Sequence, residues 1–483
     1  MAAATDLDTG RTRLRRGVLA AMSGLLVAVF VATLAMTIVT TALPAIMHGL
    51  GGSPQQYGWV IAAMLLAVTA SGPVWGKLAD RMSRNTLLSR AIALFAIGSL
   101  LAGAAPDASV LITARVIQGA GLGGLLTIVQ IVMASLVGPR KRGAYMGLFS
   151  GVSAVATVGG PLLGGVVVET PFLGWRWCFW IGIPGVLAAL PLLRRTAFPA
   201  PVVIDRGRLD WAGALLIPAG TSVLLVWLSL SGHQFPWLSG MSAGIVGTGL
   251  AILAVAVAAE RRAADPLFPQ RILGDRTVAL SIVASATLGA VATGVPVLLV
   301  QYFQLARGYS PTQAGLLTLP LIGGLALASL ICGRLIARSG RWKRHVVTGG
   351  TAVVAGLILL ASLGIDAPLA VIVAGMVVLA LGIGASRGTL VVAAQNRLEA
   401  PDLGTGTSAV LFFHLLGGAV GVAALSAVVA LFAGGPDGPA TAHEHGTAAA
   451  LAFGAGVAAV GLVAGALLRP TPLRRTVDDD GSG

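Results

Sequence analysis

Charged residues are scarce in this chain, and acidic residues are scarcer than basic ones. Of 483 residues, 10% are charged, with 18 Asp and Glu against 32 Lys and Arg, whereas 56% are hydrophobic and the mean hydropathy is +0.89. Ordinary soluble domains contain about 25% charged residues. The composition therefore excludes a soluble globular protein and indicates a polytopic membrane protein.

Cysteine and the usual catalytic clusters are also nearly missing. The two cysteines, Cys178 and Cys332, fall in or beside expected membrane helices, where apolar packing is a better interpretation than a disulfide. The one cluster of His and acid, at 443–445 in an expected outer loop 434–446, lacks an obvious third metal ligand. No Gly-x-x-x-x-Gly-Lys-Ser/Thr run occurs, so ATP is not expected to drive the protein. We expect neither an enzyme nor a bound metal or cofactor.

Long apolar runs recur along the whole chain. Each contains about 20 residues, which is enough to cross roughly 30 Å of hydrocarbon as an α-helix. Their centres lie near residues 30, 67, 95, 122, 157, 185, 221, 248, 290, 324, 354, 379, 420 and 457. The sequence therefore predicts an all-α protein with fourteen transmembrane helices.

Basic residues are distributed unevenly between the two ends of these runs. Nearly all 32 fall in the N-terminal arm, in the tail or in segments after even-numbered runs, where Arg387 and Arg397 are assigned to the segment after the twelfth run. Cytoplasmic segments are enriched in Lys and Arg, so we expect both termini in the cytoplasm. The net charge of +14 then reflects contact with anionic lipid headgroups. Nucleic-acid binding is not expected, because no single basic patch is formed.

The runs divide into two bundles and an extra pair. We expect a cytoplasmic N-terminal arm at 1–16, a six-helix bundle at 17–195, a linker at 196–210, two extra helices at 211–259, a second linker at 260–276, a second six-helix bundle at 277–468 and a cytoplasmic tail at 469–483. Duplicated bundles are typical of secondary transporters, which bind their cargo near the bilayer midplane.

Two short segments repeat each other and support a duplication. GKLADRMSR at 76–84 follows the second run, and GRLIARSGR at 333–341 follows the tenth, with Ala337 where the first copy has Asp80. Asp80 can accept hydrogen bonds from basic groups and from the N-terminus of a neighbouring helix. The first copy is then either a clamp that forms in one conformation and opens in another, or a solvated basic loop that only sets topology. The residues of this conformational-switch loop are Gly76, Asp80, Arg81 and Arg84.

Two further runs carry unusual patterns. The fourth contains RVIQGAGLGG at 115–124, where Arg115 and Gln118 lie on one helix face although a charged residue inside a membrane helix is costly. The fifth contains GPLLGG at 160–165, whose small residues permit close helix contact and whose proline kinks the helix. The residues of this second pattern are Gly160, Pro161, Gly164 and Gly165.

With these motifs the chain resembles the fourteen-helix drug:proton antiporters of the major facilitator superfamily. The resemblance continues at residues 174–185, 302–320 and 403–418. It implies the major facilitator fold, alternating access by two rocking bundles, proton antiport, an exporter-type motif in the fifth run and a role for Arg115 in handling protons or cargo. The alternatives are an Arg115 pinned to backbone carbonyls at a helix crossing and a generic packing face in the fifth run.

One acid of the family's pattern is missing. The first run ends LAMTIVTTALP at 34–44, with Ala35 where these antiporters usually have an acid. Carboxylates inside the membrane are costly and are usually kept for proton or cation work. We therefore expect neutral or anionic cargo to be favoured over lipophilic cations.

A proton carrier is not obvious, because none of the 18 acids falls at the midpoint of a run. The proton-coupling candidates are Arg115, His414, which is suited to titrate near neutral pH, and Glu169, near the outer end of the fifth run. The alternatives are a hydrogen-bonded packing role for His414 and a surface-anchored helix end for Glu169.

The residues expected to face the cargo cavity are mostly neutral. A cavity lined by Thr, Gln, Met and aliphatic side chains suits a bulky amphipathic molecule. The candidates are Thr33, Thr37, Thr40, Gln118, Gln130, Gln301 and Gln304.

We therefore expect a monomeric, multi-pass secondary exporter of hydrophobic or amphipathic small molecules, coupled to protons, in a bacterial cytoplasmic membrane. Drug or antibiotic efflux, and hence multidrug resistance, is the expected activity. The alternative is a lipid or lipid-like exporter, or a proton-independent uniporter, which fits the loss at Ala35.

Overall fold

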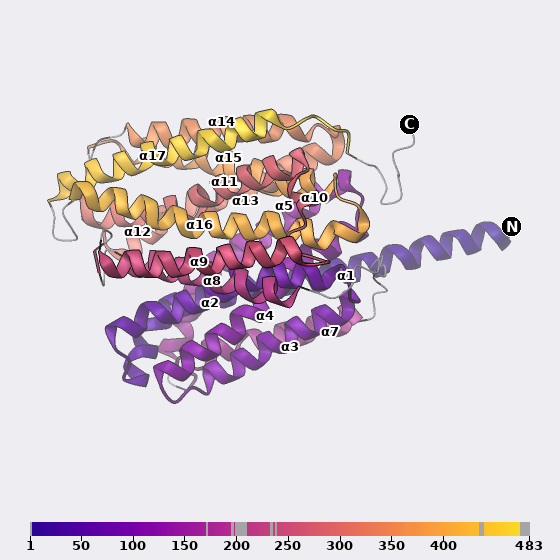
Figure 1. Ribbon diagram of the computed structural model, residues 1–483, viewed down its shortest axis with the longest axis horizontal. Coiled ribbons are helices and arrows are strands. Elements are labelled where there is room, and N and C mark those ends of the chain that lie inside the picture. Colours follow the sequence, from indigo (N-terminus) through magenta and orange to yellow (C-terminus); the bar gives the residue numbers. More distant parts are fainter. Residues whose placement is uncertain are drawn as a thin grey trace. The chain divides into compact units, whose positions relative to one another are not determined.

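The computed structural model describes residues 2–170, 172–194, 198, 210–231, 235–236, 239–362, 364, 366–433 and 439–473, with side chains from Met22 onward except at 54–55, 229–230, 311 and 433. Helices account for nearly all of these residues (Figure 1). In chain order they are α1 Ala2–Leu50, α2 Pro54–Ala79, α3 Arg84–Gly103, α4 Ala108–Leu136, α5 Pro139–Glu169, α6 Trp177–Trp180, α7 Gly182–Arg194, α8 Trp211–Leu230, α9 Gly240–Arg262, α10 Gln270–Leu273, α11 Arg276–Gln301, the π-helix η1 Tyr302–Ala306, α12 Pro311–Leu317, α13 Leu319–Ser339, α14 Trp342–Ala361, α15 Leu369–Gln395, the 3-10 helix η2 Ala400–Asp402, α16 Leu403–Ala433 and α17 Ala440–Leu467.

Fourteen helical segments in the described part of the chain are long and apolar enough to cross a membrane. Every centre expected from the sequence lies inside one of them, so the prediction of fourteen spans is confirmed. The first span is Met22–Leu50, although α1 itself begins at Ala2 and so includes residues 2–16 of the predicted arm.

Several scarce acids are used to begin helices. Asp107, Asp210 and Asp275 are the N-caps of α4, α8 and α11, and each side chain accepts a hydrogen bond from a backbone N–H of the first turn. An N-cap of this kind stabilises a helix by about 1 kcal/mol. These three acids therefore lie at helix ends and not at span centres.

The chain clusters into two compact units. Unit 1 contains residues 1–137, 155–205 and 403–405, and unit 2 contains residues 138–154, 206–402 and 406–483. The two extra helices cluster in unit 2 with the C-terminal helices. Each unit also includes the first residues of a helix whose remainder belongs to the other, α5 in unit 2 and α16 in unit 1.

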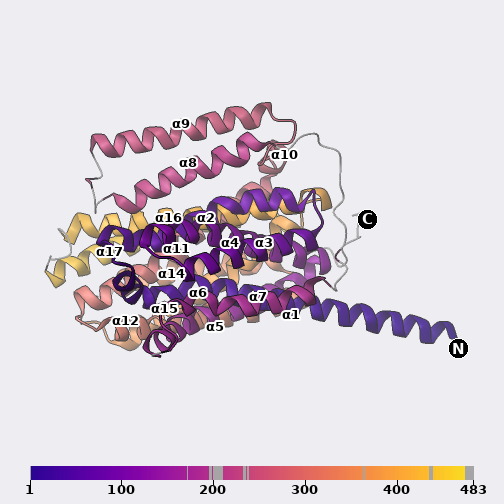
Figure 2. The same cartoon turned by 90° about the horizontal axis from the view of Figure 1, so that it is seen from below.

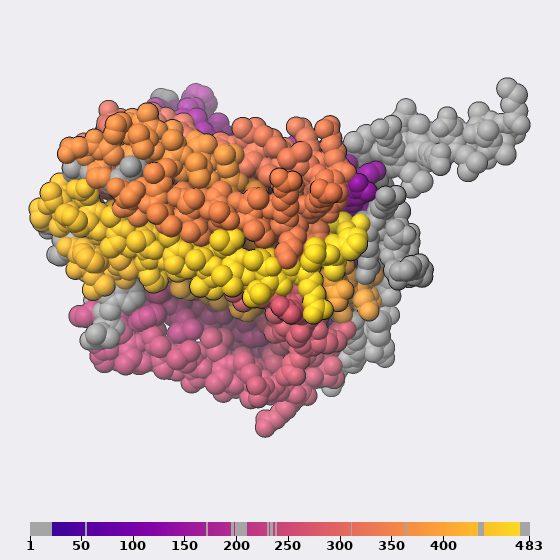
Figure 3. Space-filling view, turned by 90° about the horizontal axis from the view of Figure 1, so that it is seen from above, coloured from indigo at the N-terminus to yellow at the C-terminus, as the bar shows by residue number. Residues whose placement is uncertain are grey.

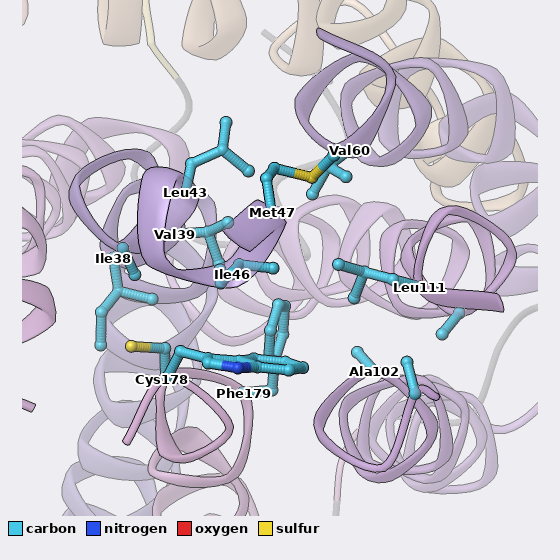
Figure 4. Close-up of a cluster of buried hydrophobic side chains, with 14 of the residues drawn as sticks. Ile38, Val39, Leu43, Ile46, Met47, Val60, Ala102, Leu111, Cys178 and Phe179 are labelled. Atoms are coloured by element: carbon cyan, nitrogen blue, oxygen red, sulfur yellow. The ribbon is translucent and has the colours of Figure 1, made fainter. Parts of the chain in front are cut away.

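Unit 1 is organised around α4, which packs against both α2 and α3. One apolar core in this unit joins side chains of α1, α2, α3, α4 and α6, and Figure 4 shows Ile46, Met47, Val60, Leu111 and Phe179 converging there. Because these residues lie on different helices, their burial fixes how the helices of unit 1 cross.

Unit 2 repeats this arrangement. Its α15 packs against α13 and α14, just as α4 packs against α2 and α3. Likewise, α11 packs against α17 as α1 packs against α7. α17 lies beside α14 on the face of unit 2 seen in Figure 3. The matching helix pairs support the duplication inferred from the repeated loop sequences.

The extra helices α8 and α9 lie side by side (Figure 2) and reach the rest of unit 2 through the segment that follows α9. Phe268 of that segment packs against Phe412 and Phe413 of α16, with ring centroids 5.8 and 6.2 Å apart. Glu260 at the end of α9 accepts hydrogen bonds from the backbone N–H groups of Leu267 and Phe268. These contacts hold the segment in place, so the pair is attached to α16 by an aromatic cluster.

Some of the predicted connecting segments lie outside the described residues, and others contain helices. The predicted linker 196–210 is described only at residues 198 and 210, and of the predicted tail only 469–473 is described. The second linker, 260–276, contains the short helix α10. His443, Glu444 and His445 are not in a loop, because α17 begins at Ala440, and no group of three metal-binding side chains occurs in the part of the chain that the structure describes.

Candidate functional site

The Asp80 carboxylate binds the N-terminus of α16. Its oxygens accept hydrogen bonds from the backbone N–H groups of Gly404 (2.7 Å) and Thr405 (2.8 Å) and from the Thr405 hydroxyl (2.7 Å), all within unit 1. Asp80 is 9% exposed, and it also interacts electrostatically with the buried Arg84. An acid at a helix N-terminus satisfies free N–H groups and is favoured by the helix dipole. The acceptance from a helix N-terminus that the sequence predicts is therefore present.

A close approach of two backbones makes this contact possible. A Cβ atom added at Gly404 would meet the carbonyl oxygen of Gly76 and the carboxylate of Asp80. Glycine at 404 therefore allows the first turn of α16 to reach the end of α2. Arg81, the remaining residue of the predicted switch loop, is half-buried.

The second copy of the loop also contacts a charged residue, but that residue is basic and lies on the neighbouring helix α5. Here Ala337 replaces the acid, and the Arg140 guanidinium of α5 donates to the carbonyl oxygens of Ala337 (3.1 Å) and Arg338 (2.6 Å), within unit 2. A cation at the C-terminus of a helix is favoured by the helix dipole, as an anion is at its N-terminus. In both copies, therefore, the repeated loop contacts the start of the fifth helix of a six-helix block. The charged residue is Asp80 of the loop in the first copy and Arg140 of α5 in the second.

Arg115 lies in packed protein between helices of unit 1. Its Nε donates to the carbonyl oxygen of Val60 (3.1 Å), and its Nη1 donates to Oε1 of Gln118 (2.7 Å). Gln118 in turn donates to the Ser99 hydroxyl (2.8 Å), and the guanidinium lies 5.9 Å from the centroid of the Phe179 ring. Both Arg115 and Gln118 are 1% exposed. This is the geometry of a guanidinium pinned at a helix crossing, and it places Gln118 in the core instead of on a cavity wall.

The small-residue pattern of α5 packs against α1. Added Cβ atoms at Gly160 and Gly164 would meet, respectively, the Thr37 side chain and the carbonyl oxygen of Ile38. The Thr37 hydroxyl lies 3.3 Å from the carbonyl oxygen of Ala156 on α5. Two glycines four residues apart therefore bring the two helix backbones close together.

We expect Gly164→Ala to destabilise the protein and Gly165→Ala to leave it nearly unchanged. A methyl group at 164 must displace the Ile38 backbone, and overpacking of this kind costs about 1–3 kcal/mol. The nearest atom to a Cβ at 165 is Cγ2 of Thr41, at an ordinary 4.0 Å. Thermal denaturation of the two purified variants in detergent measures the difference, and equal melting temperatures would contradict the proposed α1–α5 packing.

α16 packs on α11 in the same way as α5 packs on α1. Added Cβ atoms at Gly417 and Gly421 would meet backbone atoms of Ala286 and Ala290. His414 lies one turn earlier on the same seam, 6% exposed, with Nδ1 2.9 Å from the carbonyl oxygen of Ser285. A carbonyl oxygen can only accept, so Nδ1 carries the proton of that bond. His414 thus occupies a hydrogen-bonded position at a helix crossing.

The remaining predicted residues are spread over several places. Glu169 is exposed and is the last residue of α5. Thr33 and Thr37 are half-buried, whereas Thr40 is exposed with its hydroxyl on the carbonyl oxygen of Thr37 (2.6 Å). Gln130 is half-buried in α4, Gln301 is exposed at the end of α11, and Gln304 is half-buried in η1.

Arg387 is the residue that the sequence analysis misplaced. The apolar run was expected to end before it, but α15 continues to Gln395 and the whole span Leu369–Gln395 includes Arg387. Its side chain is exposed. A second charge inside a predicted span, comparable with Arg115, was the signal that could have located it.

Comparison with known proteins identifies the class of the chain. The model of the Major Facilitator Superfamily matches residues 25–422. The human organic anion transporter MFSD10 has a solved structure with a TM-score of 0.66 and 13% identity, covering 92% of this chain and 99% of that one. A proton:xylose symporter, XylE, gives a TM-score of 0.64 and 14% identity over 95% and 98% of the two chains. The chain belongs to the major facilitator superfamily, a family of membrane transporters and not of enzymes, and it has that superfamily's all-α fold with fourteen candidate membrane-spanning helices.

Curated relatives include proteins named as efflux pumps. An uncharacterized MFS-type transporter of Mycobacterium tuberculosis is 34% identical over 410 residues, which are 85% of this chain and 59% of that protein. The efflux pump dotC of Dothistroma septosporum is 33% identical over 408 residues, covering 83% and 69% of the two chains. The multidrug transporter protein MdtP of Bacillus subtilis is 29% identical over 412 residues, covering 84% and 74%. The chain therefore spans about three fifths of the length of the first of these relatives.

Proposed function

We propose that the chain is a secondary exporter of hydrophobic or amphipathic small molecules, of the drug or antibiotic efflux kind, that works by proton antiport with alternating access. The observation that carries the proposal is the α1–α5 seam, where the pattern Gly160, Pro161, Gly164 and Gly165 packs on α1. The resemblance associates that pattern with exporters, and relatives named as efflux pumps and as a multidrug transporter support the same activity.

Within this function the Asp80 contact is the proposed conformational switch. A buried carboxylate bound to three donors of one helix end stabilises the conformation in which it is made, and its loss favours a conformation in which it is broken. Arg115, His414 and Glu169 stay the candidates for proton handling. Arg115 and His414 are held by protein groups, which favours a structural contribution from both.

A specific observation favours proton-independent transport or lipid export as the second candidate function. Ala35 is buried in α1, and every described Asp and Glu with a described side chain lies at a helix end or in a connection. Cycles of protonation in exporters usually need a carboxylate inside the membrane, so this chain either couples through another group or does not couple to protons.

Transport by proteoliposomes under an imposed pH gradient tests the proposal. Cationic, neutral and anionic amphiphiles are compared in parallel, with protein-free liposomes as the control. Gradient-driven movement of neutral and anionic compounds is expected. Transport that is indifferent to the gradient would replace antiport with the second candidate function, and failure to move any of the three classes would overturn the export proposal.

A further inference from the structure

Arg387 occupies an unusual position for a charged residue in a membrane helix. It lies eight residues before the end of α15 at Gln395, about 12 Å along the helix axis. Arg387 lies inside the candidate membrane span Leu369–Gln395, and a guanidinium within a span is costly unless it pairs with another group or faces water. Its position therefore needs an explanation beyond the charge distribution that sets topology.

The face of α15 that carries Arg387 is otherwise packed in protein. One turn before it, Ile383 is 0% exposed, and one turn after it Leu390 and Val391 are 1% and 4% exposed. Residues three and four apart share a helix face. Arg387 is exposed within that buried face, so its side chain borders an opening in the packing instead of lipid, and reaching along lipid to the membrane surface does not account for it.

No protein group neutralises this charge within the described part of unit 2. Neither a hydrogen bond nor an ion pair connects Arg387 to a residue that the structure describes. Two acids of unit 2 have other partners: Asp402 forms a two-pronged ion pair with Arg271 at 2.7 Å, and Asp275 caps α11 and pairs with Arg397 at 3.3 Å.

We propose that Arg387 binds the anionic head of the cargo, a carboxylate or sulfonate on an aromatic or aliphatic body. A guanidinium offers five N–H donors in a fixed planar fork that matches such oxyanions in pairs. This inference rests on the proposed export function and deepens it. The expected preference for anions is then due to the positive charge of Arg387 and not only to the missing acid at Ala35.

Two dyes of matched shape test the assignment. Anilinonaphthalenesulfonate is anionic, and N-phenyl-1-naphthylamine has the same aryl framework without the sulfonate. We expect Arg387→Gln to weaken binding and export of the sulfonate by at least about tenfold, the effect of one charge-assisted pair, while the neutral dye changes less than about twofold. Arg387→Lys keeps the charge but loses the fork, so an intermediate loss is expected.

The controls separate this inference from the export proposal. Arg344→Gln removes the same charge from an exposed position at the start of α14 and is expected to leave both dyes unaffected. If the wild type exports neither dye, the export function fails. If it exports both, and Arg387→Gln changes both equally or neither, the export function stands and the role of Arg387 is overturned. Melting temperatures of the variants are measured alongside, and a parallel loss for both dyes with a lowered melting temperature likewise overturns a specific role.

Lipid headgroups carry the same kind of anion, so the membrane composition is varied. In phosphatidylcholine alone and with added phosphatidylglycerol, a cargo site is expected to give the same preference for the sulfonate dye. Disappearance of that preference when phosphatidylglycerol is added would assign Arg387 to lipid headgroups and overturn the cargo assignment.

Discussion

Replacing Asp80 by Asn is expected to reduce export by at least about tenfold while the protein stays folded. The carboxylate accepts from two backbone N–H groups and one hydroxyl at the N-terminus of α16. Hydrogen bonds to a charged group contribute about 1.5–3 kcal/mol each, and a change of about 1.4 kcal/mol in a conformational equilibrium is already a factor of ten. The amide keeps one acceptor oxygen and loses the charge that the helix end favours. Export by proteoliposomes measures the effect.

The matched control is Asp366→Asn, which removes the same charge from an exposed connection and is expected to export normally. Thr405→Val removes only the hydroxyl donor and is expected to give a smaller loss than Asp80→Asn. Wild-type export by Asp80→Asn would mean that the contact is not part of the switch. A collapse of its melting temperature would mean that the contact holds the fold instead.

Arg115→Ala is expected to lower the thermal stability more than Gly164→Ala does. It leaves Oε1 of the buried Gln118 without its donor and opens a void beside Phe179. An unsatisfied buried polar group costs roughly 1–3 kcal/mol, and the cavity adds to that cost. Thermal denaturation in detergent measures the loss, with Arg176→Ala as the control, because the exposed Arg176 guanidinium only lies over the Trp175 ring.

A double variant shows whether Arg115 and Gln118 act as one unit. Residues in one hydrogen-bond network are non-additive, so Arg115→Ala with Gln118→Ala is expected to be little worse than Arg115→Ala alone. Additive losses would contradict the network. If Arg115→Ala instead melts like the wild type but no longer exports, the proton or cargo role implied by the resemblance would replace the structural one.

The positions of the acidic residues could be predicted in part from the local sequence. Their sparseness and their position outside span centres are evident in the sequence, and the structure places Asp107, Asp210 and Asp275 as N-caps, a local role decided by the next few residues. Asp80 was expected to meet a helix N-terminus, but no local rule could identify α16, because the partner lies more than 300 residues away in the chain.

The polar residues of the spans show where local pattern fails. Gln118 was expected on a cavity wall as one of the neutral polar residues of the spans, yet in the structure both ends of its amide have protein partners. Arg387 was assigned to a connection because hydropathy alone gives soft helix ends, and its helix continues for two more turns. Whether a polar group in a span is satisfied by a neighbour or left for a ligand depends on which helices pack against it.

The sequence by itself determined the class of this protein, its fourteen spans, the duplication and the motifs, since hydropathy, helix length and short-range spacing are properties of the chain alone. Only the tertiary structure decided that Arg115 is pinned by Val60 and Gln118, that the extra pair is attached through Phe268, and that Arg387 is exposed on a buried face. Those facts depend on contacts between helices far apart in the chain. In a membrane span the free energy of a polar side chain is set by such contacts, because the surrounding lipid offers no hydrogen bonds.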